Sequence, residues 1–163
     1  MEHNYLISNY HGGELYRGIC FRDEKTMCIH GGAGVGGEHR VLLNTWPKSN
    51  PCELMRWAVI CVDYAQPVNF SSLWVNGAHV TNFSSIDVKG GTRGMVIGDK
   101  TIDSKSNVNS FHGDIAAVEI YSQQGGYLAD GVKLAIMTTL AREYGIKLDT
   151  QWEQCLTLRY CAS

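Results

Sequence analysis

The segment Ser72–Val80 constrains the fold of this chain more than any other, because it carries the clearest hairpin signal in the sequence. Its residues, SLWVNGAHV, place Asn76-Gly77 between two short arms with alternating apolar residues. Asn and Gly readily adopt positive φ, which the tight turn between two antiparallel strands requires. The segment therefore predicts a hairpin, and antiparallel sheet as the main architecture.

Further strand-like runs with turn signals between them extend this pattern along the chain. They are Glu14–Phe21, Lys25–His30, Glu38–Thr45, Leu54–Tyr64, Arg93–Gly98, His112–Ser122 and Cys155–Cys161. The run Leu54–Tyr64 (LMRWAVICVDY) is rich in β-branched and aromatic residues, which favours a central strand. We expect Trp57 in this run and Trp74 in the hairpin to lie in the core.

One late segment predicts a helix at about residues 128–144. Seven of its residues fall at the helical spacings of three and four: Leu128, Val132, Ala135, Ile136, Thr139, Leu140 and Tyr144. Asp130 or the turn before it suits the start of this helix, and Arg142 and Gly145 suit its end. We therefore expect an all-β, two-sheet antiparallel sandwich with one C-terminal helix, as a single domain over residues 1–163.

Composition excludes some classes of partner. Charged residues make up only 18% of the 163 residues, the net charge is −2, and no stretch clusters Lys and Arg. A broad basic surface for nucleic acid is therefore not expected. No apolar run approaches the length of a membrane span, so we expect no membrane insertion. Residues Met1–Tyr10 lack the features of a signal peptide, which suggests a module of a larger protein or assembly.

The six cysteines leave two alternatives open. Cys20, Cys28 and Cys61 lie in apolar, strand-like runs, where a free cysteine behaves as a small hydrophobe. Mostly free thiols are one alternative, and one or more disulfides are the other, because spacing alone selects no pairing. No C-x-x-C pair occurs, and the spacings do not resemble a zinc site.

The glycine run CIHGGAGVGGEHR contains the G-x-G-x-x-G spacing at Gly32, Gly34 and Gly37. A dinucleotide loop must open a helix, since the helix N-terminus holds the pyrophosphate. The following residues, EHRVLLNTWP, are too short before their proline and too strand-like for that helix. We expect Gly31–Gly37 to connect neighbouring strands and to border a ligand rim.

Two longer stretches resemble a known family. RWAVICVDYAQPVNFSSLWVNGAHV resembles a strand–loop–hairpin of concanavalin A-like, laminin G-like jelly rolls. MVIGDKTIDSKSNVNSFHGDIAAVEIYS and YLADGVKLAIMTTLAREYGI resemble its C-terminal signature. The signature positions are occupied by Phe111, Gly113, Asp114, Ile115, Ile120, Tyr121, Leu140, Tyr144 and Gly145. The resemblance covers about residues 56–148 and implies a concanavalin A-like sandwich that binds carbohydrate or protein at a loop edge or concave face.

Catalytic and metal-binding patterns are weak. Asp114 and Glu119 are five residues apart, so on one strand they would point to opposite faces, and the paired-carboxylate motif of the family's glucanases is absent. We expect Asp114 to anchor a turn, Glu119 to face solvent, and the chain not to be an enzyme. His30 and His39 are expected to be isolated surface or turn residues.

A calcium site is the open alternative to an absence of cofactors. Asp99, Asp103, Asn107 and Asn109 make the loop between two expected strands rich in oxygen, which calcium prefers. Their spacing matches no EF-hand loop. We therefore expect no cofactor.

Sugar binding needs an aromatic face and side chains that bond hydroxyl groups. The residues expected to form such a rim are Trp46, Asn44, Tyr10, His11, Arg93, Asn107, Asn109 and Trp152. We expect a lectin-like module that binds cell-surface glycans in attachment or adhesion, on an extracellular or virion surface. A module of this size is similar to the glycan-binding head of a non-galectin, group B-like rotavirus spike, and a secreted invertebrate or bacterial adhesion module is the other host context. The rival classes are a laminin G-like protein-interaction module and a glycoside hydrolase.

Overall fold

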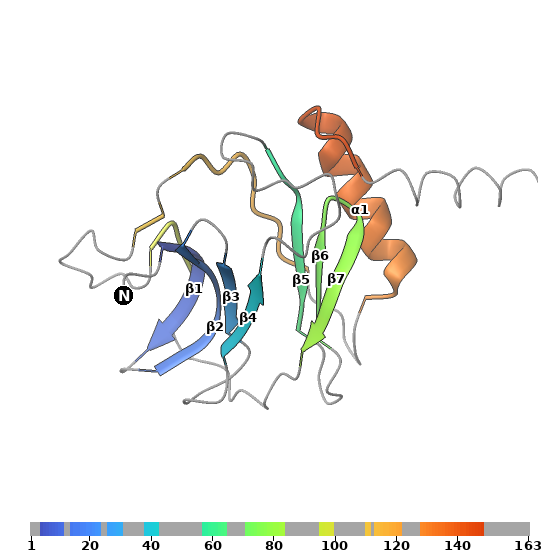
Figure 1. Cartoon of the computed structure of the whole chain (residues 1–163). Helices are drawn as coiled ribbons and strands as arrows, with labels where there is room; N and C mark the ends of the chain where they lie inside the picture. The colour runs from blue at the N-terminus through green and yellow to red at the C-terminus, as the bar shows by residue number, and fades with distance from the viewer. Residues whose placement is uncertain are drawn as a thin grey trace, which may run out of the picture.

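The computed structural model describes residues 4–11, 14–23, 26–30, 38–42, 57–64, 71–83, 95–99, 110–111, 113–121 and 128–148. This part of the chain forms two antiparallel sheets and one helix (Figure 1). The five-stranded sheet has the order β4-β3-β2-β1-β8, with β1 at Asn4–His11, β2 at Glu14–Asp23, β3 at Thr26–His30, β4 at Glu38–Leu42 and β8 at Val96–Ile97. The three-stranded sheet has the order β5-β6-β7, with β5 at Ile60–Asp63, β6 at Ser71–Val75 and β7 at Ala78–Phe83. The expected mostly-β architecture is confirmed.

The hairpin predicted at Asn76-Gly77 is confirmed. Strands β6 and β7 pair in antiparallel register around this turn, and Asn76 and Gly77 have φ values of 48° and 83°. Asn76 also ties the turn to the preceding strand. Its N–H donates to the Val59 carbonyl at 2.9 Å, and its Oδ1 accepts from the Val59 N–H at 2.9 Å.

The long strand expected at Leu54–Tyr64 is shorter in the structure. Only β5 is paired, residues 57–59 are not in a strand, and residues 54–56 lie outside the described part. The Val59 carbonyl still accepts from a backbone N–H, that of Asn76, but the Val59 N–H donates to the Asn76 side chain, so regular pairing of β5 with β6 stops at Ile60. The core position expected for Trp57 is wrong, since its side chain is 49% exposed, whereas Trp74 is buried as expected.

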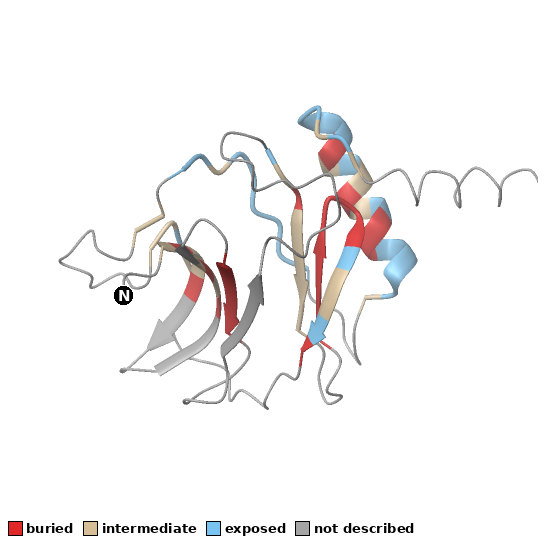
Figure 2. Cartoon of the chain, in the orientation of Figure 1, coloured by how far each residue is buried: buried red, intermediate tan, exposed pale blue. Residues whose placement is uncertain are grey.

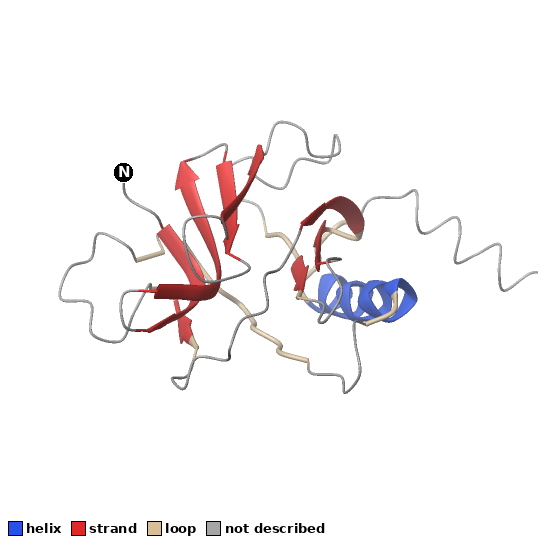
Figure 3. Cartoon of the chain, turned by 90° about the horizontal axis from the view of Figure 1, so that it is seen from below, coloured by secondary structure: helices blue, strands red, loops and turns tan. Residues whose placement is uncertain are grey.

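The strand expected at His112–Ser122 is also wrong. Residues 113–121 form no strand, and Val118, Ile120 and Tyr121 are exposed. His112 and Ser122 lie outside the described residues. Figure 3 draws 113–121 as a loop that runs outside both sheets. Alternating apolar residues favour an extended backbone, but a strand also needs a partner ladder, which this segment lacks within the described chain.

The two sheets share one core. Met27 and Ile29 of β3 pack with Leu73 and Val75 of β6 and with Phe83 of β7. These residues follow the two-residue period of a strand, so each strand sends alternate side chains into the space between the sheets. In Figure 2 the described residues of β3 and β6 are buried along the whole strand.

Helix α1, at Asp130–Glu143, covers the other face of the three-stranded sheet (Figure 1). Leu134, Met137 and Ala141 pack against Val59 and Trp74. The observed helix lies within two residues of the predicted bounds at each end. None of the seven residues with the predicted helical spacing is fully buried, and Leu134, Met137 and Ala141 form the contact with the sheet. Apolar residues occur around most of the helix, so their spacing alone did not select one face.

The ends of α1 combine one expected and one unexpected feature. Gly145 has a φ of 64°, which confirms the predicted left-handed residue after the helix. At the start, Ala129 is the N-cap and makes no side-chain cap bond, so Asp130 does not cap the helix but lies in its first turn. The Asp130 carboxylate pairs with Lys133 instead.

The strands on either side of the glycine run are neighbours. Strands β3 and β4 pair in antiparallel register, from Thr26 with Leu42 to His30 with Glu38. Residues 31–37 themselves lie outside the described part. Because a strand and not a helix begins at Glu38, the expectation of a connection between neighbouring strands is confirmed, and the helix that a dinucleotide loop requires is missing.

Candidate functional site

Most of the expected rim lies outside the described residues. The rim residues outside them are Asn44, Trp46, Arg93, Asn107, Asn109 and Trp152. The strand expected at Cys155–Cys161 also lies outside the described residues. Tyr10 and His11 are the last residues of β1, a strand that the sequence did not predict. The rim therefore stays a prediction. The structure does show at which end of the sheet the described strands next to the rim residues in the sequence begin or end.

The topology sorts these strand ends into two groups. Neighbouring strands of the five-stranded sheet are antiparallel. The last residues of β1 and β3 therefore lie at the same end of the sheet as the first residues of β2 and β4. The chain also enters β8 from this end, which is the end of Tyr10 and His11. We call it the Tyr10 end. Arg93 precedes β8 by three residues in the sequence.

The opposite end of the sheet holds the start of β1 and the last residue of β4, Leu42. Asn44 follows Leu42 by two residues and Trp46 by four. Ser110 bridges Tyr5 near the start of β1 and directly follows the segment with Asn107 and Asn109. We call this the Leu42 end.

The two sides of the segment 100–109 are clasped together. The Ser110 hydroxyl donates to Asp99 Oδ2 at 3.2 Å, and the Ser8 hydroxyl donates to the Asp99 carbonyl at 3.0 Å. Phe111 N–H donates to the Gly98 carbonyl at 2.8 Å. Asp99, one of the four oxygen-bearing residues of the calcium alternative, thus binds the protein itself. Asp103, Asn107 and Asn109 lie outside the described residues, so calcium stays untested.

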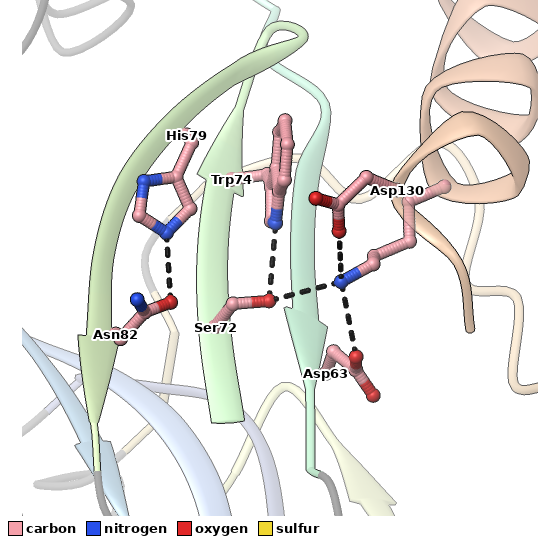
Figure 4. A network of polar contacts seen from close by, with 7 residues as sticks. Asp63, Ser72, Trp74, His79, Asn82 and Asp130 are labelled. Carbon is pink, nitrogen blue, oxygen red and sulfur yellow. Dashed lines mark hydrogen bonds and ion pairs between the residues drawn. The ribbon is translucent and has the colours of Figure 1, made fainter. Parts of the chain in front are cut away.

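A buried polar network joins α1 to the three-stranded sheet (Figure 4). The Lys133 ammonium donates to Asp63 Oδ2 at 3.1 Å and to Ser72 Oγ at 3.2 Å, and it pairs with Asp130 Oδ1 at 3.0 Å. Trp74 Nε1–H donates to the same Ser72 hydroxyl at 3.0 Å. Lys133 is only 3% exposed, so it enters the network nearly dehydrated.

The surroundings of Lys133 keep it charged. Burial acts to lower its pKa, but the hydrogen bonds to Asp130 and Asp63 and their negative charges outweigh burial, so the pKa of Lys133 is raised. The ammonium also lies 5.5 Å from the centroid of the Trp74 ring, within range of a cation–π contact. A lysine held in this way is a permanent cation at neutral pH.

This electrostatic arrangement limits the chemistry of the network. A Ser–Lys pair needs a neutral lysine as the base, and the raised pKa of Lys133 leaves Ser72 without one. Asp63 and Asp130 are two neighbouring carboxylates, but the ammonium lies between them where a glycosidase would place its substrate. The network is therefore suited to docking the helix.

Sequence reasoning missed this network, although one signal was present. Asp130 and Lys133 are spaced i, i+3 on the helix, a spacing that favours an ion pair. Cys61 lies beside the network as a free thiol. Burial raises the pKa of Cys61, with Lys133 lowering it and Asp63 raising it further, so this thiol stays protonated.

A second cluster lies on the face of the five-stranded sheet that points away from the shared core. It contains Tyr5, Cys20, Cys28 and His30. Cys20 Sγ lies 3.6 Å from His30 Nε2, and the rings of Tyr5 and His30 stack at 6.0 Å between centroids. The expectation of a surface or turn position for His30 is wrong, because His30 is buried at the end of β3, where its ring packs on Tyr5.

Cys20, Cys28 and Cys61 carry reduced thiols and are not in disulfides, as one of the two alternatives predicted. Cys52, Cys155 and Cys161 lie outside the described residues. Glu119 is exposed as expected and accepts a hydrogen bond from the Tyr121 hydroxyl. Asp114 is exposed as well, and the turn expected around it stays a prediction.

Comparison of the chain with protein-family models, with curated proteins and with solved structures gives no match. Within the described ranges, no three His, Cys, Asp or Glu side chains are grouped so that they could hold a metal ion. None of the helical segments that the structure describes is long and apolar enough to cross a membrane. A function must therefore be argued from the fold and from the placement of its residues.

Proposed function

We propose that this chain is a non-catalytic glycan-binding module of the concanavalin A-like, jelly-roll type. Its partners are cell-surface glycans, and its role is attachment or adhesion on an extracellular or virion surface. The observation that carries the proposal is that the described strand ends next to four of the rim residues in the sequence lie at one end of the five-stranded sheet. An aromatic residue, Trp46, and three amides, Asn44, Asn107 and Asn109, all follow or precede described residues at the Leu42 end.

The chemistry of these side chains suits a sugar. A tryptophan ring packs on the C–H face of a pyranose, and an amide donates and accepts hydrogen bonds with neighbouring hydroxyls. The clasp between Asp99 and Ser110 brings the two sides of the amide-bearing segment together beside the start of β1. A loop with fixed ends loses less entropy when a ligand orders it.

The neutralised carboxylates support recognition over hydrolysis. Asp63 and Asp130 share the Lys133 ammonium, and Asp114 and Glu119 are exposed side chains of the 113–121 segment. Hydrolysis of a glycosidic bond needs an acid and a base or nucleophile that face each other across the bond. Asp63 and Asp130 do not supply that arrangement, because the Lys133 ammonium lies between them.

The proposal also includes the kind of protein to which this module belongs. The receptor-binding head of a group B-like rotavirus spike is the context we favour, and a secreted adhesion module is the alternative. Sequencing the flanking gene separates them. A downstream segment homologous to a virion protein supports the first, and a cellular leader or anchor supports the second.

A glycan array with the purified chain tests the function. We expect at least one glycan to bind, and Trp46→Ala to weaken that binding about tenfold or more, equivalent to about 1.4 kcal/mol. Trp57→Ala, which removes an exposed tryptophan outside the expected rim, is the matched control and leaves the affinity unchanged. Trp152→Ala tests whether the tail contributes. Chelation of divalent cations with EDTA leaves binding unchanged, because no cofactor is expected.

Two results would overturn the proposal. One is an array without any binder together with measurable hydrolysis of a polysaccharide. The other is loss of affinity in Tyr10→Ala with none in Trp46→Ala, which moves the site to the Tyr10 end. Circular dichroism of each variant shows that the fold is retained.

The second candidate function is a laminin G-like protein-interaction module. The exposed large apolar side chains favour it: Met95, Ile97, Val118, Ile120 and Tyr121. Exposed apolar surface of this kind often marks a protein-binding site. An array without a binder, together with a protein partner whose affinity falls in Ile120→Ser but not in Trp46→Ala, selects this candidate.

A further inference from the structure

The register of β2 and β3 places two cysteines directly opposite each other. Cys20 pairs with Cys28, and Tyr5 of β1 pairs with Cys20. Opposed residues of antiparallel strands have Cα atoms about 4.5–5.5 Å apart, and the Cα atoms of a disulfide lie about 4.4–6.8 Å apart. The backbone therefore holds this pair at the spacing that a disulfide requires.

The two side chains also share one face and one environment. Cys20 and Cys28 pack together with Tyr5, and both are fully buried. Their sequence neighbours Met27 and Ile29 point into the shared core on the opposite face. The two thiols are thus adjacent and separated from the core between the sheets.

A base lies next to the pair. His30 follows Cys28 by two residues, so it shares the same face of β3, and its Nε2 atom lies 3.6 Å from Cys20 Sγ. An imidazole at this distance can take the thiol proton and stabilise the thiolate, which is the reactive form. The Tyr5 ring stacks on the imidazole and helps to orient it.

We propose that Cys20 and Cys28 form a thiol–disulfide couple that exchanges with a small-molecule disulfide such as oxidised glutathione. The structure shows the dithiol form. The proposal goes beyond glycan recognition and does not depend on it. A metal site is the other use of such side chains, but the described Cys and His groups do not hold the geometry of one.

The exchange balances in two steps. The Cys20 thiol gives its proton to His30, and the thiolate attacks glutathione disulfide, so that a Cys20–glutathione bond forms and one glutathione leaves with the proton. The Cys28 thiol then loses its proton and attacks Cys20 Sγ, so that the Cys20–Cys28 bond forms and a second glutathione leaves, which takes up that proton. The dithiol is oxidised by two electrons, and one glutathione disulfide is reduced to two glutathiones.

The test is equilibration of the purified chain in glutathione buffers of increasing oxidised fraction. Samples are quenched in acid, denatured, alkylated and mapped by mass spectrometry. We expect a Cys20–Cys28 cross-linked peptide that carries two hydrogens fewer and grows with the oxidised fraction. Because both thiols are buried, a sub-denaturing urea concentration accelerates the reaction. Separate alkylation of Cys20 and Cys28 at every buffer ratio overturns the proposal.

Variants separate the couple from general oxidation. Cys20→Ala and Cys28→Ala each abolish the cross-link, whereas Cys61→Ala, which removes the free thiol of the other sheet, leaves it unchanged. Cross-linking of Cys20 to Cys61 in place of Cys28 contradicts the register and overturns the proposal. The wild-type result does not depend on how well the alanine variants fold.

The role of His30 has its own readout. His30→Gln slows the exchange about tenfold at pH 7, because less of the Cys20 thiol is ionised. Its rate rises with pH as that of an ordinary thiol does, and the wild-type rate levels off at lower pH. The final ratio of disulfide to dithiol is expected to change less than the rate. Equal rates and pH profiles for the two proteins would remove His30 from the proposal.

Discussion

Ser71 and Ser72 are neighbours on β6, yet their hydroxyl groups face opposite sides of the three-stranded sheet. Ser72 Oγ joins the Lys133 network, where it accepts from Trp74 Nε1–H. Ser71 Oγ is buried and has no hydrogen-bond partner among the described residues. A buried hydroxyl without a partner lowers the free energy of unfolding, so the two serines should respond to substitution in opposite ways.

We expect Ser71→Ala to raise the free energy of unfolding by about 0.5–1 kcal/mol, because it removes an unsatisfied hydroxyl. Ser72→Ala is the matched control and should lower it by about 1–2 kcal/mol, because it leaves the Trp74 N–H without its acceptor. Urea denaturation measures both. A loss of stability in Ser71→Ala would contradict the prediction.

Lys133 is the residue on which the docking of the helix depends most. Lys133→Met leaves the partly buried Asp63 without its cation and should lower the free energy of unfolding by about 2–4 kcal/mol. The double variant Lys133→Met, Asp63→Asn should recover part of this loss, because it also removes the stranded charge. Urea denaturation of the single and double variants gives the coupling free energy between Lys133 and Asp63. A double variant that is no more stable than Lys133→Met would contradict the prediction.

The same network predicts a pH dependence. The folded protein raises the pKa of Lys133 above its ordinary 10.5, so it holds the proton more tightly than the unfolded chain does. This stabilisation is complete below pH 10.5 and is lost as the pH rises through the folded-state pKa. The difference in stability between wild type and Lys133→Met should therefore shrink at alkaline pH. A difference that stays constant up to pH 12 would contradict it.

Individual residues were predicted from sequence only where a local rule fixed their environment. Trp74 lies beside a recognised turn and is buried as expected, whereas Trp57 precedes β5 and is half exposed. The burial of His30 depends on Tyr5 and Cys20, which come from two other strands. Such contacts between strands follow from register, which residue patterns alone do not give.

At the scale of elements, the β6–β7 hairpin offers the most direct test. Asn76→Ala should lower the free energy of unfolding by about 2–3 kcal/mol, because it loses the bond to the Val59 N–H and strains a residue at positive φ. Asn76→Gly keeps the backbone conformation and should lose only the bond, about 1–2 kcal/mol. Thermal and urea denaturation measure both, and equal losses would assign the whole effect to the bond.

Elements with strong local signals were predicted well. The Asn-Gly turn fixed the hairpin, and the apolar spacing placed the ends of α1. The buried face of α1 was not predicted, because it depends on the residues that the sheet presents to the helix, Trp74 and Val59. The 113–121 segment has the alternation of a strand but no ladder in the described chain, and pairing is a property of two segments.

At the scale of the whole molecule, the helix and the sandwich contribute different contacts. The shared core joins the two sheets, whereas α1 is held by Leu134, Met137, Ala141 and the Lys133 network. We expect Met137→Ala to accelerate amide hydrogen exchange in α1 and to leave the amides of β2 and β3 unchanged. Exchange followed by mass spectrometry measures this. Equal acceleration in β2 and β3 would mean that the helix and the sandwich open together.

The antiparallel, two-sheet architecture was predicted from short runs and turn signals, and the strand order was not. Alternating residues identify strands, but the neighbour of each strand depends on long-range packing. The candidate site was limited in the same way. Its residue types were proposed from sequence, whereas the strand directions show which described strand ends lie next to them along the chain.

Strand β6 is buried on both of its faces, since Leu73 and Val75 enter the shared core and Trp74 lies under the helix. In a library of all single substitutions, β6 should accept almost no polar replacement at Leu73, Trp74 or Val75. Strand β7 is buried at Ala78 and Phe83 and exposed at His79 and Asn82, so polar replacements should be tolerated at the two exposed positions. The exposed positions of β7 are thus where a fluorophore or an affinity tag can be attached without disturbing either end of the five-stranded sheet.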